Sequence, residues 1–120
     1  MPHGPRFEKL VSDAKSRVEE VSATEAAQRQ ARGVVLVDVR EAEEFAKEHA
    51  KNALPLSKGV IELRIEKHVP DLGTEIICYC GGGSRSALAA DNLKKMGYMN
   101  VLSLAGGFKA WKDAKLPTES

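Results

Sequence analysis

The residues best suited to carry out a reaction are Cys80 and Arg85, which stand five positions apart in a glycine-rich loop. Successive glycines let the backbone turn tightly, so that several N–H groups can point inward and bind an anion. A helix starting just after the loop adds free N–H groups and the positive end of its dipole. A thiol held there is expected to become a nucleophilic thiolate, and Arg85 to stabilise it and hold an anionic substrate. The candidate substrate-binding residues are Gly81, Gly82, Gly83, Ser84, Arg85 and Ser86.

The cysteine loop has other interpretations, which the spacing favours less. Cys80 would be an inert packing residue if the glycines formed an ordinary turn. A dinucleotide-binding loop fits poorly because Ser86 stands where the third glycine belongs, and a nucleotide-hydrolase loop needs Gly-Lys-Ser or Gly-Lys-Thr. A zinc site is not expected, because Cys78 and Cys80 have no second pair of ligands and the histidines are scattered. We therefore predict no metal site. The histidines expected at the surface or at helix ends are His3, His49 and His68.

Other reactive side chains near the loop are predicted to be structural. Cys78 is expected to be a buried packing thiol, because two cysteines two residues apart on an extended strand strain a disulfide. Asp38 and Arg40 end another strand and are expected to be structural residues near the site. Arg40 and Glu44 are one helical turn apart and are predicted to pair, which would tie that strand end to the next helix.

The loop needs a strand before it and a helix after it, and the sequence predicts both. Residues 76–80 form an apolar run typical of a strand buried on both faces, and Ala89, Leu93 and Met96 lie on one helical face. Further strands are predicted at Val21, 34–37, 53–56 and 101–104. Helices are predicted between them and after Gly106-Gly107. This alternation predicts an α/β fold, a parallel sheet with helices on both faces, and ligands bind such sheets at the carboxyl ends of the strands.

The first predicted helix lies outside this alternating pattern. Phe7, Leu10, Val11, Ala14 and Val18 recur at helical spacing and form one apolar face. We expect this amphipathic helix to pack on the domain rather than to bind a partner. The predicted organisation is an N-terminal helical extension at residues 1–17 and the main domain at residues 18–120.

Length and composition exclude several classes of protein. A chain of 120 residues with 42% hydrophobic and 29% charged residues is typical of one ordinary globular domain. A net charge of +1 gives no reason to expect nucleic acid or an anionic membrane as a partner. No apolar run approaches the roughly 18 residues of a membrane helix, and no signal core follows the N-terminus. Two cysteines separated by one residue cannot join distant segments, so we predict a cytoplasmic protein.

Four blocks of the sequence form a recognisable set. They are residues 36–41 with Glu44-Phe45, residues 49–53, residues 77–86, and residues 104–111 with Leu116-Pro117. Together they resemble the rhodanese-like family, and specifically its single-domain sulfurtransferases, over about Val18 to Pro117. The cysteine loop combined with Gly-Gly-Phe-x-Ala-Trp is the specific part of this resemblance. The loop at 48–53 departs from the family's Gly-His-Ile-x-Gly-Ala, since both glycines and the isoleucine are replaced.

The resemblance implies a fold and an activity. The family fold is a five-stranded parallel sheet flanked by helices. The implied activity is transfer of a sulfane sulfur, as in thiosulfate, to cyanide or a thiol through a persulfide on Cys80, without a cofactor. The backbone of residues 81–86 would then cradle the persulfide, and Arg85 would hold the anionic donor. The implied partners are a small sulfur donor and a thiol or cyanide acceptor, which can be a thiol-carrying protein.

Two alternatives stay open at this point. One is a module of the same family that relays sulfur or binds a protein, with little turnover of small donors. The other is a phosphatase or arsenate reductase of the same architecture, whose loop has five residues between cysteine and arginine. Here the count is four, which makes a smaller anion site and favours sulfur transfer by analogy.

Overall fold

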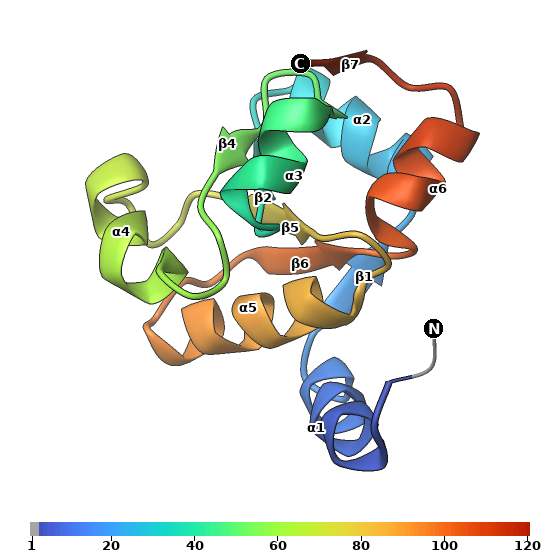
Figure 1. The fold of residues 1–120 in the computed structure, drawn as a ribbon. Helices are drawn as coiled ribbons and strands as arrows, with labels where there is room; N and C mark the ends of the chain where they lie inside the picture. The colour runs from blue at the N-terminus through green and yellow to red at the C-terminus, as the bar shows by residue number, and fades with distance from the viewer. Residues whose placement is uncertain (1–2) are drawn as a thin grey trace.

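The computed structural model describes residues 3–120, and its centre is a five-stranded sheet in the order β1-β6-β5-β2-β4 (Figure 1). Every neighbouring pair in this sheet is parallel, which confirms the predicted fold class. β5, the strand before the cysteine loop, lies in the middle between β2 and β6. The strands are β1 (Glu19–Val21), β2 (Val35–Asp38), β4 (Leu54–Pro55), β5 (Ile76–Tyr79) and β6 (Val101–Leu104).

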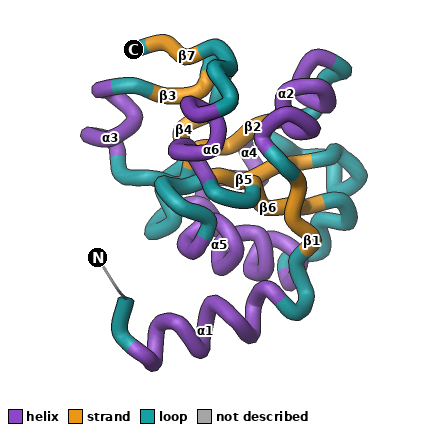
Figure 2. Tube along the Cα trace, turned by 90° about the vertical axis from the view of Figure 1, so that its right-hand side faces the viewer, coloured by secondary structure: helices purple, strands orange, loops and turns teal. Residues whose placement is uncertain are grey.

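Helices cover both faces of the sheet (Figure 2). One face packs against α4 and α5, and the other packs against α2 and α6. The short helix α3 follows β2 and contributes Phe45 to the second of these cores. The helices other than the first are α2 (Ala23–Ala31), α3 (Ala42–Lys47), α4 (Ile61–His68), α5 (Ser84–Lys95) and α6 (Gly107–Asp113).

The alternation of side chains along β5 assigns the cysteines to one face. Ile77 and Tyr79 lie in the core beneath α2 and α6, whereas Ile76 and Cys78 lie in the core beneath α4 and α5. Successive residues of a strand point to opposite faces, so Cys80 falls on the side of α5. The sequence predicted that Cys80 is the last residue of this strand. In the structure β5 ends at Tyr79, so Cys80 is the first residue after it.

The N-terminal helix α1 (Pro5–Lys15) packs on the outside of α5, which agrees with the expectation that it packs on the domain (Figure 1). Leu10, which the predicted apolar face included, is 55% exposed instead. Val11 and Ala14 form a small apolar core with Leu88 of α5, and Phe7 packs against it. An ion pair fixes the end of α1, because the Arg17 guanidinium donates to both carboxylate oxygens of Asp91 at 3.0 and 2.8 Å. Met1 and Pro2 of the predicted 1–17 extension lie outside the described residues.

A second, two-stranded sheet was not predicted. β3 (His49–Ala50) pairs antiparallel with β7 (Thr118–Glu119), and elements of two residues are too short to leave a periodic pattern. His49 is expected at the surface or at a helix end, and the structure places it at a helix end but buried: its Nδ1 lies 2.7 Å from the Phe45 carbonyl in the last turn of α3. Its side chain is 9% exposed and stacks on Phe45 with ring centroids 3.6 Å apart. Within residues 3–120, no helix has the length and apolar character needed to span a membrane.

Candidate active site

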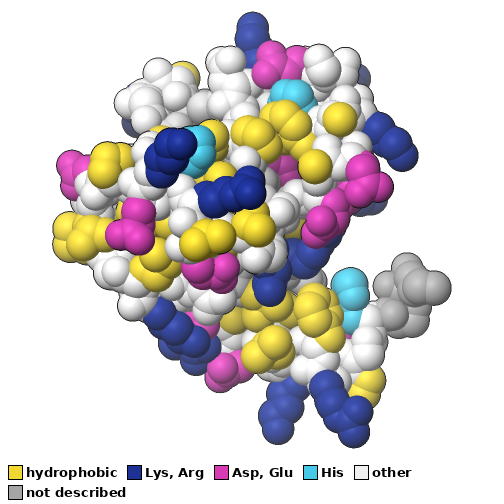
Figure 3. All heavy atoms as spheres, turned by 60° about the vertical axis from the view of Figure 1, so that its left-hand side comes forward, with side chains coloured by type: hydrophobic (Ala, Val, Ile, Leu, Met, Phe, Trp, Pro, Cys, Tyr) yellow, Lys and Arg dark blue, Asp and Glu magenta, His cyan; other side chains and the backbone are white. Residues whose placement is uncertain are grey.

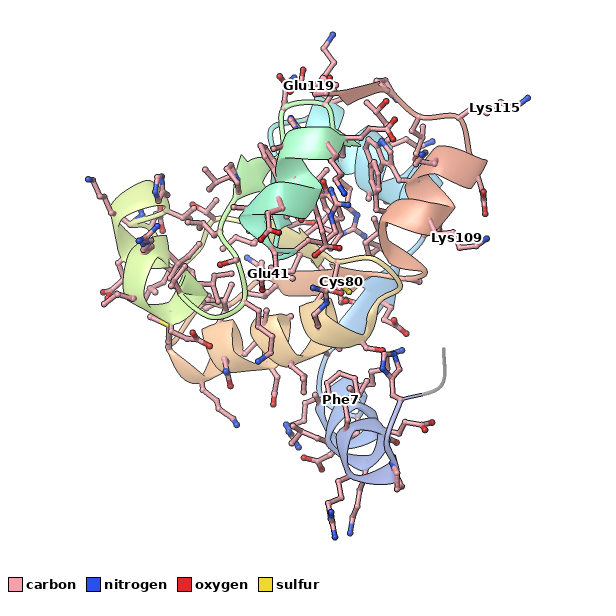
Figure 4. All side chains as sticks on the ribbon, viewed as in Figure 1. Phe7, Glu41, Cys80, Lys109, Lys115 and Glu119 are labelled. Carbon is pink, nitrogen blue, oxygen red and sulfur yellow. The ribbon has the colours of Figure 1, made fainter. Side chains whose placement is uncertain are left out.

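Cys80 lies at the bottom of a pocket of about 360 Å³, between the end of β5 and the start of α5. The residue is only 1% exposed, so its sulfur is reached through this pocket rather than across the open surface. Figure 4 shows Cys80 near the first turn of α5, with Phe7 of α1 below it. The pocket is lined by His3, Gly4, Phe7, Cys80, Gly82, Ser84 and Arg85.

The backbone of the loop turns at Gly83 so that its N–H faces the sulfur. Gly83 has φ +106°, a left-handed conformation that residues with a Cβ rarely adopt. In this conformation its N–H donates to Cys80 Sγ at 3.0 Å. Within residues 3–120, the Gly83 N–H is the one loop amide that hydrogen-bonds to the sulfur. The sequence predicted that several N–H groups of the loop would point inward. Since α5 begins at the next residue, Ser84, the helix N-terminus also points its positive end at this site.

Two buried hydroxyls lie behind the sulfur. The Cys80 thiol donates to Ser86 Oγ at 3.5 Å, and Ser86 Oγ lies 2.8 Å from Ser103 Oγ of β6. Ser86 and Ser103 are fully buried. Sequence reasoning found Ser86 but missed Ser103. The available signal was a single polar residue inside the apolar strand 101–104.

The second cysteine is placed differently. Burial raises the pKa of the Cys78 thiol to about 12, so this thiol stays protonated at neutral pH. Cys78 belongs to the core beneath α4 and α5 and does not line the Cys80 pocket. Its surroundings fit the predicted packing role.

Arg85 lies at the mouth of the pocket, paired with a carboxylate that the sequence did not connect to it. Its Nη1 donates to Glu44 Oε1 at 3.3 Å, and its side chain is 35% exposed. The same Glu44 oxygen accepts from the Glu41 N–H at 3.1 Å. Partial burial acts to raise the pKa of Glu44, but the hydrogen bonds from Arg85 and Glu41 hold it below its usual value. Glu44 is therefore a charged competitor for any anion that Arg85 binds.

Arg40 does not pair with Glu44 as predicted. Its guanidinium makes a bidentate pair with Asp38, at 3.1 Å from Nε to Oδ1 and 2.9 Å from Nη2 to Oδ2, and lies over the Phe108 ring. Asp38 Oδ2 also accepts from the Tyr79 hydroxyl at 2.6 Å. This buried network joins β2, β5 and α6 around the loop. The geometry is that of structural support, because none of these side chains lines the Cys80 pocket.

The first turn of α6 holds the cysteine loop through its backbone, which sequence reasoning also missed. The Phe108 N–H donates to the Cys80 carbonyl at 2.7 Å, and the Lys109 N–H donates to the Gly81 carbonyl at 3.3 Å. This close approach needs Gly107, whose φ is +58°. A Cβ there would lie 2.5 Å from the Cys80 carbonyl oxygen. In the sequence, the Gly-Gly pair at 106–107 was the signal that two backbone segments approach closely here.

Gly107→Ala is expected to destabilise the fold and to displace the cysteine loop. The overlap with Cys80 and the left-handed backbone together should lower the free energy of unfolding by about 3 kcal/mol. Urea denaturation followed by circular dichroism measures this change. Gly59→Ala is the matched control, because a Cβ there meets nothing within 4 Å, and should change stability by less than about 1 kcal/mol. Similar losses in both variants would contradict the role of Gly107.

The described residues offer no site for a metal ion of the usual kind. Within residues 3–120, no three His, Cys, Asp or Glu side chains gather in a metal-binding arrangement. The groups that this site brings together are one sulfur atom, the backbone amide facing it, two hydroxyls and one arginine.

Comparison with known sequences finds related domains in other proteins. The rhodanese-like domain family matches residues 22–114 of the chain. Thiosulfate sulfurtransferase GlpE of Haemophilus influenzae is 35% identical over 101 residues, which cover 84% of this chain and 94% of that protein. GlpE of Coxiella burnetii is 37% identical over 81 residues, or 68% and 74% of the two chains. Protein slr1261 of Synechocystis is 40% identical over 92 residues, which are 75% of this chain but only 49% of that protein.

Two solved structures share the fold over nearly the whole chain. RPA3614 of Rhodopseudomonas palustris, described as a possible tyrosine phosphatase, superposes with a TM-score of 0.83 at 30% identity and covers 99% of both chains. The match therefore includes α1 as well as the sheet. The polysulfide-sulfur transferase homodimer of Wolinella succinogenes superposes with a TM-score of 0.82 at 25% identity, covering 95% of this chain and 87% of that one.

Proposed function

Because this chain belongs to the rhodanese-like domain family, we propose that it is a sulfurtransferase that carries sulfur as a persulfide on Cys80. The observation that carries the proposal is the Gly83 N–H placed 3.0 Å from Cys80 Sγ at the bottom of a pocket. An amide aimed at sulfur favours the negative charge of a thiolate or a persulfide. The names of the GlpE relatives and of the polysulfide-sulfur transferase support the same chemistry.

The proposed reaction has two steps. In the first, the Cys80 thiolate attacks the sulfane sulfur of thiosulfate, the S–S bond of the donor breaks, and sulfite leaves with the bonding electron pair. In the second, cyanide or a thiolate takes the outer sulfur, and the Cys80 thiolate is restored. The amide of Gly83 and the hydroxyl of Ser86 would hold the sulfur between the two steps, and Arg85 would hold the anionic donor. Both cysteines are free thiols, which suits a reaction in the reducing cytoplasm.

Two other functions are weaker candidates. A phosphatase is suggested by the description of RPA3614, but the loop here has four residues between cysteine and arginine. Within the described chain, the Gly83 N–H is the one loop amide that bonds to the sulfur. A single amide offers few hydrogen bonds to a tetrahedral oxyanion such as phosphate. A relay module that takes sulfur only from a protein partner would have the same site but would not react with small donors.

Intact-protein mass spectrometry tests the proposal and separates these candidates. After incubation with thiosulfate, the chain is expected to gain the mass of one sulfur atom, and cyanide should remove it and form thiocyanate. A protein that takes no sulfur from thiosulfate, yet takes one from a persulfide-carrying protein, is a relay module. A protein that takes no sulfur from either source but hydrolyses p-nitrophenyl phosphate would overturn the proposal in favour of a phosphatase.

A further inference from the structure

We propose that the N-terminal end of α1 selects the sulfur donor: Phe7 and His3 form an aromatic wall of the Cys80 pocket that favours donors carrying an apolar organic group. This inference rests on the proposed function. It concerns a part of the chain that lies before residue 22, where the match to the rhodanese-like domain begins.

The aromatic wall is an observed part of the pocket. His3, Gly4 and Phe7 line the same hollow as Cys80 and Arg85. The His3 and Phe7 rings contact one another, with centroids 4.9 Å apart and planes tilted by 52°. The cysteine loop and Arg85 therefore make one side of the pocket, and two aromatic rings from a different part of the chain make the other.

The wall is held in place by the packing of α1 on α5. Phe7 packs against the small apolar core of Val11, Ala14 and Leu88, so its ring continues a buried contact between the two helices. Arg17 and Asp91 fix the other end of α1. In Figure 4, Phe7 rises from α1 toward the body of the molecule, on the side where Cys80 lies.

The hollow continues beyond the sulfur site. A second pocket of about 310 Å³ runs along α1 and shares His3, Phe7 and Ser84 with the first. Figure 3 shows apolar side chains gathered on the lobe formed by α1, next to the hollow between this lobe and the body. A five-atom donor such as thiosulfate fills only a few water-sized volumes of about 30 Å³ each. The space along α1 is therefore available to an organic group attached to the sulfur.

The charges of the pocket favour the same class of donor. The cation that lines the pocket is Arg85, and Arg85 is already paired with Glu44. Its charge therefore neutralises a bound dianion incompletely. A thiosulfonate has one negative charge and carries its organic group on the sulfonyl sulfur, which is bonded to the sulfane sulfur. Aromatic rings attract both sulfur and other rings, so an arylthiosulfonate can place its sulfane sulfur on Cys80 and its ring against Phe7. In this step the Cys80 thiolate attacks the sulfane sulfur, and the S–S bond of the donor breaks. A persulfide forms on Cys80, and arylsulfinate leaves with the bonding electron pair.

The test compares two donors of equal charge that both release a sulfinate, benzenethiosulfonate and methanethiosulfonate, with cyanide as the acceptor. The measured quantity is the ratio of their kcat/KM values. The unsubstituted protein is expected to prefer benzenethiosulfonate. Phe7→Ala should lower this preference by about fivefold, the usual size of one lost aromatic contact. His3→Ala removes the other ring from an exposed position, cannot disturb the core, and should lower the preference in the same direction.

Leu10→Ala is the matched control, because Leu10 is an apolar side chain of α1 that is 55% exposed and lines neither pocket. It should leave both kcat/KM values unchanged. Two results would overturn the inference and leave the proposed function intact. One is no preference for benzenethiosulfonate in the unsubstituted protein. The other is that Phe7→Ala and His3→Ala keep the same preference as the unsubstituted protein. If neither thiosulfonate places sulfur on Cys80 while thiosulfate does, the inference alone is overturned. If thiosulfate fails as well, the proposed function is overturned, and the inference with it.

Discussion

Cys80→Ser is expected to abolish sulfur transfer from thiosulfate to cyanide, with a loss of kcat/KM of at least about 10³-fold. A serine oxygen cannot hold the transferred sulfur as a persulfide, so the covalent route disappears. The serine hydroxyl can still accept from the Gly83 N–H and donate to Ser86, so the fold around it should be kept. Thiocyanate formation measures the activity, and the mass of the intact protein should show no added sulfur.

Cys78→Ala is the matched control for this prediction. Cys78 is the other free thiol, is fully buried, and lies two residues before Cys80. Its replacement leaves a small cavity in the core and should lower stability modestly, while thiosulfate still adds one sulfur to the protein. If Cys80→Ser retained turnover, or if the added sulfur disappeared in Cys78→Ala, the assignment of the nucleophile would be wrong.

The strand, loop and helix around Cys80 could be predicted because their signals are local. An apolar run, three glycines and a helical period follow one another within about 20 residues, and each requires only its own neighbours. The structure moves the end of the strand by one residue, to Tyr79, and starts the helix at Ser84. The parallel order of the sheet followed from the alternation of strands and helices.

The partners of Arg85 and Ser86 could not be predicted, because they come from distant parts of the chain. Glu44 meets Arg85 across 41 positions, and Ser103 meets Ser86 across 17. Helical spacing suggested Arg40 as the partner of Glu44, but β2 ends with Asp38 two residues away, and this buried carboxylate pairs with Arg40 first. Local rules identify which side chains are reactive, whereas only the tertiary fold determines which charge faces which.

Arg85→Ala is expected to weaken reaction with a doubly charged donor more than with a singly charged one. The guanidinium lines the Cys80 pocket and is the charged group placed to bind an anion there. Loss of one charge-assisted contact of about 1.5–3 kcal/mol should lower kcat/KM for thiosulfate by roughly 10- to 150-fold. The loss for methanethiosulfonate should be clearly smaller. Arg85→Lys keeps the charge and should recover part of the thiosulfate activity. Equal losses for both donors would show that Arg85 does not bind the donor by its charge.

Glu44→Gln tests the opposite change at the same contact. Glu44 holds Arg85 at 3.3 Å and stays ionised, because hydrogen bonds lower its pKa. An entering dianion must displace this carboxylate and also lie near its charge. Removing the charge is therefore expected to raise kcat/KM for thiosulfate by about fivefold, the size of one partly exposed ion pair. Adding Glu44→Gln to the Arg85→Ala variant should give no such gain, because the arginine that Glu44 otherwise holds is then absent. A gain that persists without Arg85 would mean that Glu44 repels the donor directly.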